Sequence, residues 1–147
     1  NFFGVVNGVQ AFLPRMLETE GERHIVNTAS MSGLHTSPDL AGYNASKFAV
    51  VAFTEVLAHE NRGRGVRFAC VCPPPVATPL LDQAKSQPKI LATVPPIRPE
   101  AVLDAIERGL DGGKLMVFPD RNAAITVWLR RHLPGLTWWN VHRVEGF

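Results

Sequence analysis

Three side chains in the first third of the sequence have the types and spacing needed to move a proton. Tyr43 and Lys47 are four residues apart, which places them about 40° apart on one side of a helix. An ammonium group one turn from a phenol favours the tyrosinate, so the phenol can pass protons to a substrate oxygen at neutral pH. Ser30 ends a β-rich run and would project from the sheet edge where α/β proteins bind ligands. The spacing therefore indicates general acid–base chemistry.

The elements that must position these side chains alternate along the sequence. Hydrophobic periodicity and turn residues predict helices over 1–18 and 43–60, strands over 24–30 and 66–72, and a loop over 31–42. They further predict a helix from Pro99 to Gly112, a strand over 114–119, and a last helix capped by Asp120 and ended by Pro134-Gly135. This order is typical of a parallel α/β sheet with right-handed crossovers. Three strands are few for such a sheet, so we expect further strands to precede residue 1.

Two details of the helices are also expected from the pattern. Pro14 should kink the first helix or end its regular part. On the helix from Tyr43, one apolar face lies roughly opposite Tyr43 and Lys47 and should pack on the protein. That face consists of Ala45, Phe48, Ala49, Ala52 and Val56, with Val50, Val51, Phe53 and Leu57 outside it. A helix that is apolar nearly all round is expected to be buried on both sides.

Composition excludes several classes of protein. The 147 residues are 46% hydrophobic and 19% charged, which suits one globular domain, and the net charge of +2 gives no basic face for nucleic acid. No apolar run approaches the roughly 20 residues that span a bilayer. Cys70 and Cys72 alternate along a strand, so we expect two reduced core thiols, and no metal site, which would need more ligands.

Several segments together resemble the short-chain dehydrogenase/reductase family. The run Tyr43-Asn44-Ala45-Ser46-Lys47 resembles its YxASK segment, and Ser30 lies thirteen residues earlier (43 − 30 = 13), at the spacing of its catalytic serine. Asn1-Phe2-Phe3-Gly4 resembles the NxxG start of its fourth helix. The segment from Cys72 to Pro79 resembles its (N/C)PGxVxTP turn, with Pro74 in place of the glycine. The resemblance runs to about residue 120, and the last 25 or so residues match weakly.

The resemblance implies a Rossmann-like three-layer α/β/α fold, present in part, in a single domain over residues 1–147. It implies an NAD(P)-dependent oxidoreductase that interconverts a carbonyl and an alcohol by hydride transfer. Tyr43 would be the general acid/base, Lys47 would hold the nicotinamide ribose hydroxyls, and Ser30 would bind the substrate oxygen. Asn1 would hold a water that links Lys47 to solvent. Besides Tyr43 and Lys47, the cofactor contacts implied are Pro73, Val76 and Thr78.

The family's glycine-rich TGxxxGxG loop, which cradles the pyrophosphate, does not occur in this sequence. The choice between NAD and NADP is therefore left open, and the 147 residues alone are expected to be inactive and poorly soluble. A second reading is a truncated, non-catalytic homologue that acts as a binding or scaffold subunit. The intact Ser30, Tyr43 and Lys47 set favours the enzyme.

Each candidate residue also has a plain structural alternative. Tyr43 and Lys47 could be a surface pair, and Ser30 could merely end a strand. Asn1 could have no role, and Thr78 could cap a turn. His35 could line a substrate pocket, although a solvated loop histidine is the favoured interpretation. Ser32 is a less favoured substitute for Ser30.

The rest of the sequence gives expectations about substrate and partners. Residues 76–97 are too long for an ordinary connection and predict a lid or binding loop, with disorder as the alternative. Leu80 and Leu81 in it suggest a moderately hydrophobic carbonyl or alcohol. Residues 121–147 should form a helix and a tail. Their tryptophans and arginines could mark a membrane or partner surface, but core or interface packing is favoured. These residues are Trp128, Trp138, Trp139, Arg130 and Arg131.

The family resemblance also gives expectations about assembly and location. In that family the helix that carries the tyrosine and the helix before it pack against a second subunit, so we expect a homodimer or homotetramer. The other partners expected are a small-molecule substrate and the nicotinamide cofactor. Neither nucleic acid nor a membrane is an expected partner, and the expected location is the cytoplasm.

Overall fold

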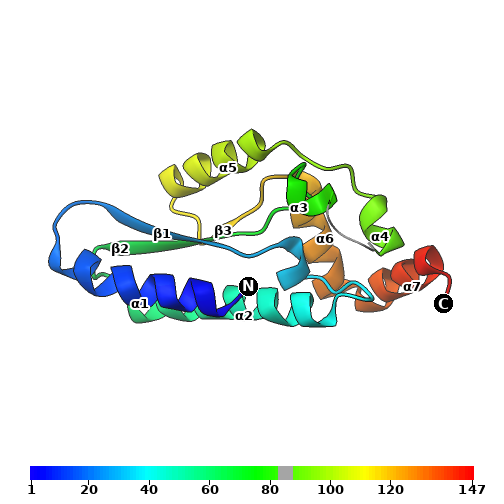
Figure 1. Ribbon diagram of the computed structural model, residues 1–147, viewed down its shortest axis with the longest axis horizontal. Coiled ribbons are helices and arrows are strands. Elements are labelled where there is room, and N and C mark those ends of the chain that lie inside the picture. Colours follow the sequence, from blue (N-terminus) through cyan, green and yellow to red (C-terminus); the bar gives the residue numbers. More distant parts are fainter. Residues whose placement is uncertain (83–87) are drawn as a thin grey trace.

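The computed structural model describes residues 1–82 and 88–147, and these form a parallel sheet with helices on both faces (Figure 1). The strands are β1 (Arg23–Thr28), β2 (Val66–Val71) and β3 (Met116–Val117), in the order β1-β2-β3. The helices are α1 (Phe3–Glu18), α2 (Ala41–Glu60), α3 (Pro79–Asp82), α4 (Lys89–Ala92), α5 (Pro99–Asp111), α6 (Arg121–His132) and α7 (Pro134–Glu145), with a 3₁₀ turn, η1 (Met31–Gly33). The layered parallel architecture predicted from the sequence is thereby confirmed.

The central strand, β2, is apolar because helices cover both of its faces. Five of its six residues are buried. It pairs in parallel with β1 from Arg23 opposite Val66 to Thr28 opposite Val71. The pairing continues beyond the carboxyl ends of the two strands. There the Ala29 amide donates to the Val71 carbonyl at 2.9 Å and the Met31 amide donates to the Pro73 carbonyl at 3.0 Å. The residue between these two bonds, Ser30, is therefore held at the carboxyl end of the sheet.

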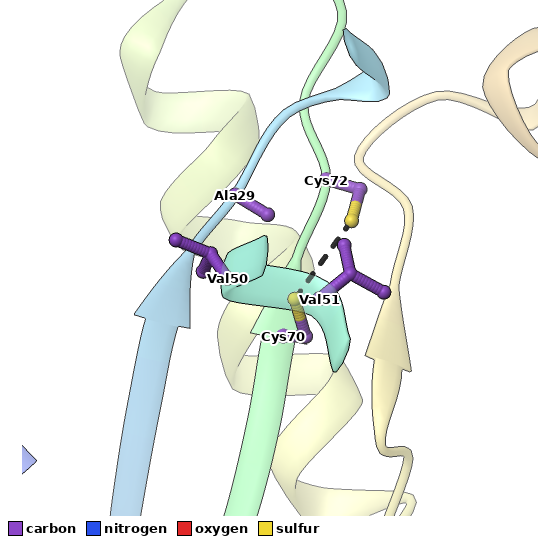
Figure 2. Close-up of a cluster of buried hydrophobic side chains, with 5 residues drawn as sticks. All are labelled: Ala29, Val50, Val51, Cys70 and Cys72. Atoms are coloured by element: carbon purple, nitrogen blue, oxygen red, sulfur yellow. Dashed lines mark hydrogen bonds between the residues drawn. The ribbon is translucent and has the colours of Figure 1, made fainter. Parts of the chain in front are cut away.

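The core has one cluster of buried side chains on each face of the sheet. On the α1 and α2 side, Ala29, Val50, Val51, Cys70 and Cys72 pack together, and Figure 2 shows both thiols on the same side of β2. Both cysteines are free and buried, as expected, and their sulfur atoms are 4.0 Å apart. The opposite cluster joins α5 to β2 and β3. Its members are Ala69, Val71, Ala105 and Val117.

Helix α2 packs on the sheet with a face other than the one that its apolar stripe predicted. The buried residues of α2 are Asn44, Val50, Val51 and Thr54. In contrast, Phe48 and Val56 of the predicted face are exposed. Because α2 is apolar nearly all round, periodicity alone could not choose the side that covers the sheet. Among the described residues, the Arg130 guanidinium lies over the Phe48 ring on this exposed side of α2, at 5.8 Å from the ring centre.

Other differences from the prediction concern element ends. Helix α1 continues through Pro14 to Glu18, and β3 has two residues rather than six. Helix α6 ends at His132, just before Pro134 as predicted, but it is not the last helix, because Pro134 begins a further helix, α7, where a tail was expected. Residues 76–97 include the two short helices α3 and α4, while residues 83–87 of that segment lie outside the described residues. No helix within the described ranges has the length and apolar character of a membrane span.

Candidate active site

Tyr43 and Lys47 lie side by side in the first half of α2. The Lys47 ammonium nitrogen is 5.7 Å from the centre of the Tyr43 ring. The same nitrogen donates a hydrogen bond of 3.0 Å to the Thr28 carbonyl at the end of β1. Burial disfavours the ammonium form and lowers the pKa of Lys47 from the ordinary value for lysine. The helix therefore presents a phenol and a half-buried amine at the carboxyl edge of the sheet.

Ser30 reaches the same edge from β1. It has extended backbone and precedes η1, and its hydroxyl oxygen accepts a hydrogen bond of 3.1 Å from the Ser32 amide. The Lys47 nitrogen is bonded to the carbonyl of Thr28, two residues before Ser30. Within residues 1–82 and 88–147, no hydrogen bond joins the Ser30 hydroxyl to Tyr43. The structure thus brings the serine, the tyrosine and the lysine to one edge, with the phenol and the hydroxyl not in direct contact.

A close backbone approach fixes the turn after Ser30 against α2. A Cβ atom at Gly33 would lie 2.6 Å from the Lys47 carbonyl oxygen and 3.0 Å from the Val51 side chain. Only a glycine fits at that distance, because real Cβ atoms essentially never come that close to backbone oxygen. Further along the loop, the Asn44 side-chain amide donates to the Ser37 carbonyl at 2.9 Å. These contacts set where Ser30 lies relative to Tyr43 and Lys47.

The position of Asn1 is determined by its neighbour in sequence. Asn1 is exposed and precedes α1, whose Phe2 ring packs edge-on against Phe53 of α2 at 5.8 Å between ring centres. This contact places the start of α1 beside α2. Among the described contacts, none joins Asn1 to Lys47, so its proposed water-holding role stays a prediction.

The turn after β2 is held by a strand-like contact with Ile97. Val76 pairs with Ile97, the Ala77 amide donates to the Ile97 carbonyl, and the Ile97 amide donates to the Pro75 carbonyl, both at 2.9 Å. The Thr78 hydroxyl is directed to the Val76 carbonyl at 3.4 Å, which is a weak local contact. The predicted cofactor contacts of Pro73, Val76 and Thr78 stay predictions.

A cavity of about 440 Å³ begins one residue beyond Ser30. Met31, Ser32 and His35 line it on the sheet side, together with Pro74 and Pro75 of the turn after β2. Its other walls come from α4, α6 and α7. The apolar members of those walls are Ile90, Leu91, Val94, Ala123, Leu129, Leu136 and Trp139. The cavity is within the size range of small-molecule sites, and its described lining begins next to Ser30 in sequence and includes neither Ser30 nor Tyr43.

His35 is partly buried and lines this cavity, which agrees with the alternative of a pocket histidine, while a role in substrate binding stays a prediction. Burial, with the nearby Arg130 guanidinium, lowers the pKa of His35, which keeps the ring neutral at pH 7. Arg130 of α6 donates to the Thr36 hydroxyl at 3.0 Å and lies over the Phe48 ring. The arginine thereby ties α6 to the loop that leads from Ser30 to Tyr43.

The three tryptophans are exposed rather than packed in the core, while interface packing, the other part of the favoured expectation, stays a prediction. Trp128, Trp138 and Trp139 are 56%, 67% and 56% exposed. Each contacts a basic or imidazole side chain one turn along its own helix, namely His132, His142 and Arg143. Trp139 also lines the cavity. Core packing of these side chains therefore does not occur in the described residues.

Sequence reasoning missed two contributors to the site. Gly33 was taken only as a loop residue, and nothing in the sequence could have shown its contact with the Lys47 backbone. Helix α7 was taken as a tail although Pro134, at its first position, is a typical helix start. The cavity residues Leu136, Trp139 and Asn140 were missed for that reason.

The residues at the sheet edge have the chemistry to hold the nicotinamide end of a dinucleotide. Lys47 uses one N–H on the Thr28 carbonyl and has two others, which suit a pair of ribose hydroxyls. Tyr43 adds a phenolic hydroxyl beside it. The donor set therefore fits a sugar with neighbouring hydroxyls, bound across the carboxyl end of a parallel sheet.

A three-layer parallel fold with a serine, a tyrosine and a lysine at its carboxyl edge defines a class of α/β oxidoreductases. The family model of short chain dehydrogenases matches residues 1–89, which is more than half of the chain. The chain therefore belongs to the short-chain dehydrogenase family, as its motifs indicated.

Curated relatives and solved structures agree with this assignment. The chain is 32% identical over 128 residues to retinol dehydrogenase 10-B of Danio rerio, covering 85% of this chain and 38% of the relative. It is 43% identical over 86 residues to the putative oxidoreductase SadH of Mycobacterium tuberculosis, covering 57% of this chain and 31% of the relative. The chain thus spans between about a third and two fifths of the length of these relatives.

Among solved structures, a short chain dehydrogenase/reductase from Burkholderia phymatum, in complex with NAD, has a TM-score of 0.76 and 30% identity. That comparison covers 91% of this chain and 56% of the solved one. A short chain dehydrogenase from Burkholderia cenocepacia, in complex with NADP, has a TM-score of 0.80 at 24% identity, over 95% of this chain and 55% of the other. The second likeness supports the fold alone.

Proposed function

We propose that this chain is the catalytic part of an NAD(P)-dependent oxidoreductase that interconverts a carbonyl and an alcohol. One observation carries the proposal. The Lys47 nitrogen lies beside the Tyr43 ring and bonds to the end of the strand that leads to Ser30. The solved relative in complex with NAD supports a nicotinamide dinucleotide as the cofactor, and the choice between NAD and NADP is left open.

In this proposal each polar side chain has one task during reduction. The dinucleotide, when bound, supplies the hydride. The Ser30 hydroxyl donates a hydrogen bond to the substrate carbonyl oxygen, which holds that oxygen in place. Tyr43 gives its phenolic proton to the same oxygen as negative charge develops on it, and takes the proton back in the reverse direction. Lys47 stabilises the resulting tyrosinate and holds the ribose hydroxyls.

The cavity beside Ser30 supports an apolar substrate. Its walls from α4, α6 and α7 contain leucine, isoleucine, valine and tryptophan side chains beside threonines, asparagines and Asp120, and a substrate with a hydrocarbon body would bury the apolar ones. This agrees with the hydrophobic carbonyl or alcohol expected from the sequence. The relatives named retinol dehydrogenase 10 suggest retinol as one apolar alcohol for a first assay.

Self-association is the second part of the proposal. Phe3 and Phe12 of α1 are 76% and 63% exposed, and α2, whose Phe53 contacts Phe2 at the start of α1, also exposes Phe48 and Val56. Exposed apolar side chains on two neighbouring helices are typical of a subunit interface. A homodimer or homotetramer would bury them, and sedimentation of the full-length gene product as a monomer would contradict this part.

Replacement of the phenol tests the chemistry. In the full-length gene product, Tyr43→Phe should lower kcat roughly 100- to 10,000-fold, because only the proton donor is lost. Affinity for NAD(P)H should change by less than about threefold, because the ring and Lys47 remain. Thr19→Val, which removes an exposed hydroxyl at the end of α1, is the matched control and should keep full activity. Turnover retained by Tyr43→Phe would refute the assignment and favour a non-catalytic binding subunit.

A further inference from the structure

Helices α4 and α7 meet through the side chain of Glu145, although 55 residues separate it from Ile90. One carboxylate oxygen, Oε1, accepts a hydrogen bond of 2.9 Å from the Ile90 amide, and the other, Oε2, accepts one of 3.2 Å from the Lys89 amide. In return, the Lys89 ammonium donates to the Glu145 backbone carbonyl at 2.9 Å. Each helix end is therefore capped by a charged side chain of the other helix.

The partial charges at the ends of the two helices show which helix the Glu145 carboxylate stabilises. A carboxylate at the last position of α7 is unfavourable for α7 itself, because the carboxyl end of a helix carries partial negative charge. At the amino end of α4 the same carboxylate is favourable, since amides there lack partners within the helix. Helix α4 has only four residues and no side-chain cap of its own. The position of Glu145 is thus explained by α4 rather than by α7.

The two helices joined by Glu145 form two walls of the cavity beside Ser30. Helix α4 contributes Ile90 and Leu91, and α7 contributes Leu136 and Trp139. An unsupported four-residue helix is not stable in water, so the position of its side chains depends on contacts from elsewhere. Loss of the carboxylate would free α4 and widen the cavity without changing any group at Ser30, Tyr43 or Lys47.

We infer that Glu145 is a positioning residue, which acts through α4 to shape the pocket for the apolar part of the substrate. This inference rests on the proposed function only for its kinetic readout. The pocket wall and the helix contact are properties of the structure that can be measured without turnover.

The test compares Glu145→Ala and Glu145→Gln with Glu107→Ala, an exposed glutamate of α5, in the full-length gene product. For reduction of 2-decanone, Glu145→Ala should raise KM roughly three- to tenfold and leave kcat within about twofold, because the hydrogen bonds lost do not touch the reacting atoms. Glu145→Gln, which keeps one acceptor oxygen, should have a smaller effect. Glu107→Ala should match the wild type.

Amide hydrogen exchange provides the readout that does not depend on catalysis. The Lys89 and Ile90 amides should exchange at least about tenfold faster in Glu145→Ala and should be unchanged in Glu107→Ala. Unchanged exchange would overturn the inferred contact, and faster exchange with an unchanged KM would overturn its role in the pocket. If the wild type reduces no carbonyl, the proposed function fails. In that case the dissociation constant of 2-decanone is measured by calorimetry on the same variants. A three- to tenfold rise in Glu145→Ala supports the inference, and an unchanged value overturns it.

Discussion

Replacement of Gly33 by alanine perturbs the site at its most crowded point. The added methyl group would lie 2.6 Å from the Lys47 carbonyl oxygen, and ordinary van der Waals contact begins at 3.4 Å. The turn η1 must therefore move from α2 by about 0.8 Å (3.4 − 2.6 = 0.8). Gly33 does not have a left-handed backbone, so the effect of the alanine is steric alone.

The expected loss follows from this displacement. Overpacking of this kind costs about 1–3 kcal/mol in the free energy of unfolding. That cost lowers Tm by roughly 3–4 °C per kcal/mol in a chain of this size. Because Ser30 immediately precedes η1, its hydroxyl shifts relative to Tyr43 and Lys47. Under the proposed function, a misplacement of nearly 1 Å lowers kcat on the order of 100-fold.

Urea denaturation and steady-state kinetics of the full-length gene product measure the two effects separately. Gly42→Ala is the matched control, because Gly42 lies in α2 with open space where its Cβ would be. It should stabilise the protein by about 0.5–1 kcal/mol through helix propensity and leave kcat unchanged. The reasoning is refuted if Gly33→Ala unfolds at the wild-type urea concentration and turns over at the wild-type rate.

Two further substitutions test the electrostatics and the buried polar contacts of α2. Because burial lowers the folded-state pKa of Lys47, its protonated form opposes folding below that pKa, and the opposition fades as pH rises towards 10.5. The free energy of unfolding of the wild type minus that of Lys47→Met should therefore increase between pH 8 and 10.5, and a flat or falling difference contradicts the burial. Thr54→Val removes the buried hydroxyl that accepts a 3.0 Å hydrogen bond from the Asn27 amide. Urea titration should show a loss of about 1–3 kcal/mol, while no loss would mean that the Asn27 amide finds another partner.

Local sequence patterns predicted most of the elements that carry the site. Strand β2 was predicted over 66–72 and observed over Val66–Val71, because a strand covered on both faces is a continuous apolar run. Asp120 was predicted as a helix cap, and its carboxylate accepts a hydrogen bond from the Asn122 amide at 3.1 Å. In both cases the sequence pattern that identifies the element lies within a few residues along the chain.

Features that depend on contacts far apart in sequence were not predicted. The cavity combines the turns after β1 and β2 with α4, α6 and α7, and no single segment carries a pattern for it. His35 shows the consequence. As a lone histidine in a polar loop it suggested solvent exposure, whereas in the structure it is partly buried and lines the cavity together with residues of α6 and α7. A histidine's surroundings are decided by tertiary packing, so its sequence neighbours could not reveal them.

Helix α2 shows why the candidate catalytic residues could be identified although their surroundings were not. Tyr43 and Lys47 lie one turn apart in any α-helix, so their proximity needs no knowledge of packing. The side of α2 that meets the sheet is decided instead by the partners that a given side can contact. Val50 and Val51 fit against β2 and Ala29, and Gly33 allows the Ser30 turn to approach on the same side. The close contact at Gly33, rather than the apolar stripe with Phe48, therefore orients the tyrosine and lysine towards the strand end.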